Sequence, residues 1–396
     1  MKVIKIIFKI IVYGFAVIGF VLMAGFFAVK YDLTNTVAVV DRNNDKYQAA
    51  SMKFDKSDSY NAQANTLSGQ PVNLSLSDLD AKIAELKNAS QTLADLQLQK
   101  WRNLCQIEVI GEVVPVNGQN IVAAYRNGVS AWTFNQMVLA VSLRLDDNQI
   151  FQKKLSDCQS LTSANYIEGA VLQKYSQGTG ENLFAWANLE SWEVVTKAIL
   201  KDEAVIKKAA STLELNPRLL VSILIVEQLR LYNTQREFYE RFFKPLEILA
   251  NANKMAWGVM AIKEKTAIDI EIHSQNSKSA FYPGEGYSHL LDFNTDNEAK
   301  ERYDRLANEH DHYYSYLYGG LLLKELIAQW EISGYNVANR PEVLATLFNI
   351  GFTRSKPKDN PQVGGSVINL NGVDYTFGSL AHEFYYSNLI PEFPLK

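Results

Sequence analysis

A long apolar segment lies near the start of the chain. Residues 10–29 contain no charged side chain, and they follow Lys2, Lys5 and Lys9. About 20 apolar residues form a helix long enough to span a bilayer, and lysines before such a segment favour a cytoplasmic N-terminus. The pattern predicts a single-pass anchor over residues 1–33 in a bacterial cytoplasmic (inner) membrane, with the remaining chain on the periplasmic or extracellular side. A cleaved signal peptide is the alternative.

Beyond the anchor, the spacing of apolar residues is mainly that of helices. Residues 34–73 are polar and rich in Asn, Asp, Ser and Gln, which predicts a linker or stalk. Apolar positions then recur at three- and four-residue steps, the period of an amphipathic helix. The predicted helices cover residues 74–103, 132–145, 167–200, 201–213, 217–228, 313–330, 341–348 and 379–386.

Two segments predict β-structure. Residues 107–116 predict a short strand that ends near Pro115. Residues 366–376 predict a hairpin, because two strand-like runs are joined by Asn371-Gly372, a favoured hairpin turn. The expected fold is therefore mainly α. Its expected parts are the anchor (1–33), the linker (34–73), a mostly helical membrane-proximal region of unknown role (74–195) and a C-terminal domain (196–396).

Composition excludes several classes of function. The chain has 396 residues and a formal charge of −4, so no nucleic-acid partner is expected. Five His and two Cys are widely scattered, and no Cys-x-x-Cys, phosphate-binding loop or Gly-x-Ser-x-Gly occurs; we expect no metal site and no cofactor. Cys105 and Cys158 either pair in an oxidising compartment or remain two buried thiols.

Glu227 is the candidate for acid–base chemistry. If Pro217 begins a helix, Leu220, Ile223 and Glu227 share one face of an otherwise apolar segment. A carboxylate is costly to ionise on such a face, so its protonated form is favoured. A protonated carboxyl is the acid that cleavage of a glycosidic bond requires. The alternative is an ion pair with Arg230, three residues further along the helix.

Three segments, taken in order, resemble one enzyme family. They are Asn216-Pro217-x-Leu219-Leu220 leading into Val226-Glu227, then Gly258-Val259-Met260-Ala261-Ile262 followed by Thr266-Ala267, then Thr346-Leu347-Phe348-Asn349-Ile350-Gly351. Together they resemble the lytic transglycosylase family, whose soluble-type catalytic domain has a goose-lysozyme-like α+β fold. The resemblance covers roughly residues 200–355 and rests on the three segments together.

The resemblance implies roles for particular residues. Glu227 is implied as the single catalytic acid and base, which cleaves the MurNAc–GlcNAc bond of peptidoglycan and leaves 1,6-anhydromuramoyl ends. Substrate-binding residues are implied in the second and third segments. They are Gly258, Met260, Ile262, Phe348 and Asn349. From the residues alone, Met260 and Ile262 could equally be core, and Asn349 could equally end a helix.

Several positions depart from the family pattern. Gln228 stands where the family usually has Ser, Ala261 replaces a cleft Gln, and Phe348 replaces a Tyr whose hydroxyl normally contacts the acid. We therefore expect a membrane-anchored peptidoglycan lytic transglycosylase, with glycan strands as its substrate and the membrane as its anchor. A lysozyme-type hydrolase is the second possibility for its reaction. The alternative is a catalytically degenerate glycan-binding or scaffold protein of the cell envelope or a secretion apparatus, with protein partners there.

Overall fold

The computed structural model describes residues 38–48, 90–129, 131–163, 168–175, 180–233 and 256–395, with parts of 9–24. Most of these residues are helical and a few form small sheets, which confirms the mainly α class. The predicted anchor at residues 10–29 lies only partly within the described residues, and no helix among them is long and apolar enough to cross a membrane.

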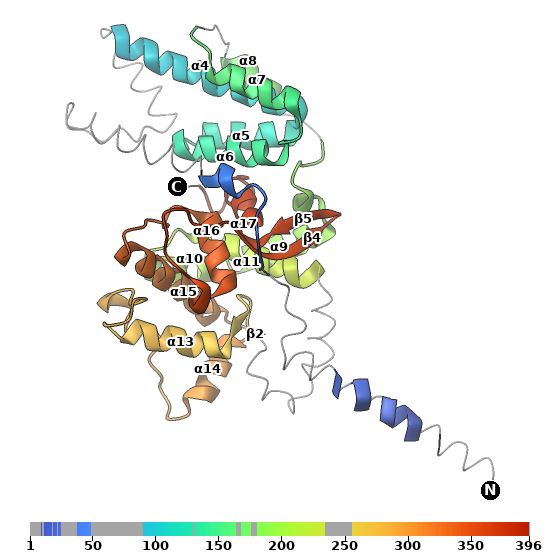
Figure 1. Cartoon of the computed structure of the whole chain (residues 1–396), viewed down its shortest axis with the longest axis vertical. Helices are drawn as coiled ribbons and strands as arrows, with labels where there is room; N and C mark the ends of the chain where they lie inside the picture. The colour runs from blue at the N-terminus through green and yellow to red at the C-terminus, as the bar shows by residue number, and fades with distance from the viewer. Residues whose placement is uncertain are drawn as a thin grey trace.

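One group of helices, at the top of Figure 1, is formed by the first half of the chain. It comprises α4 (Ser90–Val113), α5 (Pro115–Arg126), α6 (Ala131–Arg144), α7 (Gln149–Gln159) and α8 (Glu168–Lys174). The strand predicted at 107–116 is wrong, because these residues continue α4 and begin α5 at Pro115. Gly111 and Gly118 explain the close packing there: a Cβ on Gly118 would lie 2.7 Å from the Gly111 Cα.

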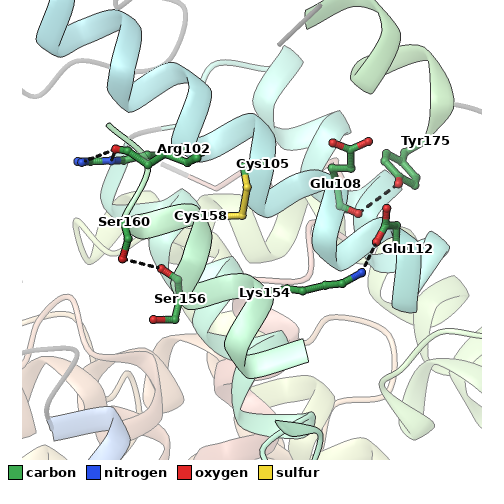
Figure 2. The surroundings of a disulfide bond; sticks show 10 residues. Arg102, Cys105, Glu108, Glu112, Lys154, Ser156, Cys158, Ser160 and Tyr175 are labelled. Atoms are coloured by element: carbon green, nitrogen blue, oxygen red, sulfur yellow. Dashed lines mark hydrogen bonds and ion pairs between the residues drawn. A yellow bond between two sulfur atoms is a disulfide. The ribbon is translucent and has the colours of Figure 1, made fainter. Parts of the chain in front are cut away.

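A disulfide joins two helices of this group. Cys105 on α4 and Cys158 on α7 are bonded, with their Cα atoms 5.6 Å apart, and Figure 2 shows the bond between the two helices. Of the two possibilities for these cysteines, the structure has the pair. The contact is continued along the helices by an ion pair between Lys154 and Glu112, whose Nζ and Oε2 atoms are 3.0 Å apart.

The second group of helices surrounds a small antiparallel sheet. It comprises η1 (Ala185–Asn188), α9 (Glu190–Lys201), α10 (Glu203–Thr212), α11 (Pro217–Asn233), α13 (Glu264–Gln275), η3 (Glu285–Tyr287), α14 (Glu298–Leu306), α15 (Tyr313–Ile332), α16 (Pro341–Ile350), η4 (Phe352–Arg354) and α17 (Phe377–Tyr385). The helices predicted at 201–213, 313–330 and 341–348 are confirmed as α10, α15 and α16. Pro217 and Pro341 each begin a helix, where their missing N–H costs nothing.

The predicted hairpin is also confirmed. Strands β4 (Gly364–Leu370) and β5 (Val373–Thr376) pair antiparallel, with Leu370 opposite Val373. Asn371 and Gly372 both have positive φ, at 52° and 79°, as a two-residue turn of this type requires. Thr376 then caps α17 by accepting a hydrogen bond from the Ser379 N–H.

Part of the predicted linker belongs to this sheet instead. Strand β1 (Ala38–Val40) pairs with β4, and Ala38 lies opposite Ser366. The Tyr47 ring, in a helical turn at 44–48, is buried in the core. The prediction of a linker over 34–73 is therefore wrong for residues 38–48, because β4 offers a strand edge that polar composition cannot reveal. The remaining residues of that range are outside the described part.

The two helix groups share one core. The buried apolar residues form one contiguous cluster that runs through both, and Glu383 on α17 binds Arg144 on α6. The boundary predicted between residues 195 and 196 falls inside α9, which is continuous from Glu190 to Lys201. The division between the groups lies before that helix.

Arg218 holds the C-terminal segment against α11. Its guanidinium is fully buried and donates to backbone carbonyls of Tyr385, Phe384, Leu389 and Phe393, at 2.6–3.0 Å. Burial lowers the pKa of Arg218 to about 10. Phe384 and Tyr385 end α17, and Leu389 and Phe393 lie in the segment that follows it, so one buried cation fixes this segment against the helix end.

Candidate functional site

Glu227 lies near the C-terminal end of α11, a helix surrounded by protein on nearly every side. Leu220 and Ile223, on the same helix face, are buried, and Glu227 itself is only 4% exposed. The helix forms here because Pro217 begins it and a long apolar run follows, and this run is buried against several neighbouring helices. The apolar helix face on which the sequence places Glu227 is therefore buried, and the carboxylate is buried with it.

Glu227 has a cationic partner. The Arg230 Nε donates to the Glu227 Oε2 over 3.1 Å, and an Arg230 Nη2–Oε2 contact completes the ion pair. Both side chains are largely buried, so the charges are paired rather than solvated. This is the alternative that the three-residue spacing allowed. Residues 234–255, which follow α11, lie outside the described part.

A hairpin packs against the end of this helix. Strands β2 (Ala256–Trp257) and β3 (Ile262–Lys263) pair antiparallel around a turn at 258–261. The Gln228 side-chain amide donates to the Val259 carbonyl over 2.8 Å, so the residue next to Glu227 holds the turn directly. Gln228, which replaces the family Ser, is thus a structural link between α11 and the hairpin.

Helix α15 holds the same turn from its other side. The Met260 N–H donates to the Ser315 hydroxyl over 3.2 Å. At Gly258, φ is +68° and an added Cβ would lie 2.4 Å from the Leu306 carbonyl oxygen, so only glycine fits. Ala261 has a φ of +50°, which is uncommon for a residue with a side chain. The turn is therefore tightly fixed in place.

Met260 and Ile262 are core residues. Both are at most 2% exposed, and the Met260 side chain lies over Gly319 of α15, where an added Cβ would meet its methyl carbon at 2.8 Å. This matches the alternative that the sequence left open for them. A direct contact with a sugar would require a change in the packing of this turn.

Phe348 and Asn349 lie near the end of α16. Phe348 is buried, and its ring is nearly parallel to that of Phe377 at 6.5 Å between centroids. The Asn349 Oδ1 accepts from the backbone N–H of Ser366 at 2.9 Å and from its hydroxyl at 3.1 Å. Asn349 therefore fixes β4 to α16, and its carbonyl oxygen is already used.

The three segments of the resemblance meet in space. The end of α11 contacts the hairpin turn through Gln228, the turn contacts α15 through Ser315, and α16 packs on both α11 and α15. The structure thus brings Glu227, Gly258 and Met260 into one region. Phe348 and Asn349 lie on α16, next to this region. Phe348 contacts Phe377 on α17, and Asn349 contacts Ser366 on β4.

Several acids and histidines in the second helix group also have structural partners. Asp269 binds Lys265 at 2.6 Å, and Asp292 binds His289 at 2.9 Å. His312 binds Asp202, which also accepts from the Tyr316 hydroxyl at 2.7 Å. Within the described residues, no group of three or more His, Cys, Asp or Glu is arranged to hold a metal ion.

One further buried acid, Glu325, was not identified from the sequence. Glu325 on α15 is fully buried, and neither carboxylate oxygen has a hydrogen-bond partner among the described residues. Burial raises the pKa of Glu325 well above its usual value, and the nearby charge of Asp269 adds to this effect. The signal was similar to the one that selected Glu227: on a predicted helix, Glu325 follows Lys324 and lies among apolar residues, which are Leu321, Leu322, Leu323, Leu326 and Ile327.

Comparisons with protein-family models, with curated proteins and with solved structures found no match to this chain. The class that the fold defines is therefore a mainly α protein with a small antiparallel sheet.

Proposed function

We propose that this protein is a membrane-anchored peptidoglycan lytic transglycosylase with a lysozyme-like α+β domain and Glu227 as its acid and base. One observation carries the proposal: Glu227 lies inside the fold at the end of α11, and its neighbour Gln228 binds the 258–261 turn at Val259. Two of the three segments that resemble the family are thus in direct contact.

In the proposed reaction, one carboxyl group acts twice. Glu227 first donates its proton to the glycosidic oxygen between MurNAc and GlcNAc. The same carboxylate then removes the proton from the muramoyl 6-hydroxyl, whose oxygen closes the 1,6-anhydro ring without water. The first step needs a protonated acid, so the proposal requires the Glu227–Arg230 ion pair to open when glycan binds.

The Cys105–Cys158 disulfide supports the proposed location. Disulfides persist in oxidising compartments such as the periplasm, and the uncharged segment at 10–29 supplies a candidate anchor. The substrate is an immobile polymer, so a tether would raise the local concentration of the enzyme.

The Glu227–Arg230 pair favours a second candidate function. The Glu227 carboxylate is already bound by the Arg230 guanidinium, and Met260 and Ile262 are buried as ordinary core residues. These features support a catalytically degenerate domain that binds glycan strands or a partner protein of the cell envelope or a secretion apparatus.

A product analysis with Glu227→Gln tests the proposal. The full-length protein, purified in detergent, is incubated with peptidoglycan, and the released fragments are analysed by mass spectrometry. We expect 1,6-anhydromuramoyl ends from the wild type and a loss of roughly 10²- to 10⁴-fold in Glu227→Gln, because removal of a general acid has effects of that size.

Glu342→Gln provides a matched control. Glu342 on α16 is also buried and bound to an arginine, Arg340, at 2.6 Å, so its replacement disturbs a comparable ion pair outside the proposed site. This variant should retain activity. Reducing ends would indicate a lysozyme-type hydrolase. If the wild type binds glycan but releases no fragments, the proposed enzymatic activity is contradicted and the degenerate domain is favoured.

A further inference from the structure

A hollow lies beside the edge of the three-stranded sheet, away from the contacts of Glu227. Its volume is about 320 Å³, and it is lined by β1, by β4 and by one face of α16. Much of the lining is apolar and includes Val39, Trp330, Leu347 and Ile350. A hollow of this size accommodates a small ligand or a few side chains.

Three cations line the same hollow. Arg354, Lys356 and Lys358 all contribute to it, and no Asp or Glu does. None of the three forms an ion pair within the described part of the chain, although Asp359 follows them in sequence. The protein carries a net charge of −4, so this cationic cluster runs against the overall balance and indicates an anionic ligand.

Two of the cations, Lys356 and Lys358, alternate along an extended segment, and Arg354 lies just before it as the last residue of η4. Ser355 has extended backbone angles, and Lys356 precedes Pro357, which disfavours helical backbone at Lys356. Arg354, Lys356 and Lys358 are exposed, whereas Ser355 between them is buried and bonded to the Trp330 indole N–H at 3.0 Å. Ser355 thus anchors the segment on α15 and leaves the cations outward.

This spacing matches that of another extended chain. Alternate residues of an extended peptide lie roughly 7 Å apart on the same side, since the rise is about 3.3 Å per residue. A facing peptide with a carboxylate at every second residue can therefore meet Lys356 and Lys358 with successive carboxylates. Its intervening side chains would point the other way, toward the apolar part of the lining.

Strand β1 provides a backbone edge for such a peptide. In the sheet order β1-β4-β5, β1 is at the edge, and its second edge pairs with no strand of the described part. Val39 and Val40 are 41% and 52% exposed. An exposed edge with apolar side chains is a template for an added strand.

We propose that the hollow between β1 and residues 354–358 binds an extended acidic peptide of a partner protein. Carboxylates two residues apart in the peptide bind Lys356 and Lys358, Arg354 adds positive charge beside them, and an intervening apolar side chain enters the hollow beside Val39 and Trp330. This binding site is separate from Glu227 and does not depend on the proposed enzymatic activity.

Calorimetric titration with two synthetic peptides tests the inference. The alternating probe is Ac-Glu-Val-Glu-Val-Glu-NH2, and the control with the same composition is Ac-Glu-Glu-Glu-Val-Val-NH2. We expect the full-length protein to bind the alternating peptide at least 10-fold more tightly. Lys356→Glu/Lys358→Glu should weaken that binding at least 10-fold, because both exposed cations become repulsive.

A charge-matched variant separates the site from bulk charge. Lys201→Glu/Lys278→Glu makes the same change in net charge at exposed positions outside the hollow and should leave the affinity unchanged. Equal binding of both peptides, or equal weakening by both double variants, would overturn the proposal. So would binding only to vesicles containing phosphatidylglycerol, lost in Lys356→Glu/Lys358→Glu, which would assign the cations to a lipid surface.

Discussion

His382 shows how burial controls a single titratable residue in this protein. Its side chain is fully buried on α17, between the rings of Tyr47 and Tyr386 at centroid distances of 5.0 and 4.8 Å. The Nε2 atom lies 3.3 Å from the Gln136 Oε1, and Nδ1 has no hydrogen-bond partner among the described residues. Burial lowers the pKa of His382 to about 4.

This environment makes stability depend on pH. Between pH 6.5 and about 4, the unfolded chain protonates His382 while the folded protein keeps it neutral, so stability falls as the pH falls. The cost between pH 7 and pH 5 should be about 2 kcal/mol. Urea unfolding of the wild type and of His382→Gln at both pH values measures this loss of stability. Between pH 7 and pH 5, the free energy of unfolding of the variant should fall by about 2 kcal/mol less than that of the wild type. Equal losses in both proteins would contradict the assignment.

At the residue scale, sequence could predict burial and name a possible partner, but it could not show whether the two residues pair. A glutamate in an apolar helical run was identifiable at Glu227, and the same rule would have selected Glu325. What separates them is the neighbourhood: Glu227 has Arg230 one turn away, whereas Glu325 lacks a described hydrogen-bond partner. The Arg230 contact was foreseeable from its spacing, but the choice between an ion pair and a free acid needed the packed structure.

At the element scale, helices and hairpins with a clear start or turn signal were predictable. Two helices begin at Pro217 and Pro341, and the hairpin turns at Asn371-Gly372, because these residues restrict the backbone locally. The strand predicted at 107–116 was wrong, since Ile107, Val109 and Ile110 are buried in a helical core. In that core, Gly111 allows the Tyr175 ring to pack closely against the helix. Strand β1 was missed because its three residues depend on pairing with β4.

The disulfide between α4 and α7 should contribute strongly to the free energy of unfolding. Cys105 and Cys158 are 53 residues apart, and closing a loop of that length in the unfolded chain stabilises the fold by about 4 kcal/mol in the chain-entropy account. Cys105→Ser/Cys158→Ser should therefore lower the free energy of unfolding by about that amount, as measured by urea denaturation. Dithiothreitol should destabilise the wild type similarly and leave the variant unchanged. A variant as stable as the oxidised wild type would contradict this role.

At the scale of the whole molecule, a buried polar cluster joins the two helix groups. Glu383 on α17 binds Arg144 on α6 and accepts from the Trp186 indole N–H at 3.0 Å, and the Arg144 guanidinium lies 3.8 Å from the centre of the Tyr375 ring. Burial raises the pKa of Glu383, and Arg144 opposes that effect. Arg144 and Glu383 are 239 residues apart in the sequence, so no local pattern could predict this contact. The boundary predicted at residue 195 therefore separated two groups that share a buried cluster.

We expect this cluster to make the two groups unfold as a single unit, and Arg144→Met tests this. Loss of the guanidinium leaves Glu383 buried without its cation, which should cost about 3–5 kcal/mol. Arg144→Met/Glu383→Gln should be less destabilised than Arg144→Met, because the remaining amide carries no charge. Urea unfolding followed by tryptophan fluorescence and far-UV circular dichroism should give one coincident transition for the wild type. Two separate transitions would mean that the groups unfold independently. A loss below about 1 kcal/mol in Arg144→Met would mean that the buried pair contributes no more than a solvated surface ion pair does, which would contradict its role in joining the groups.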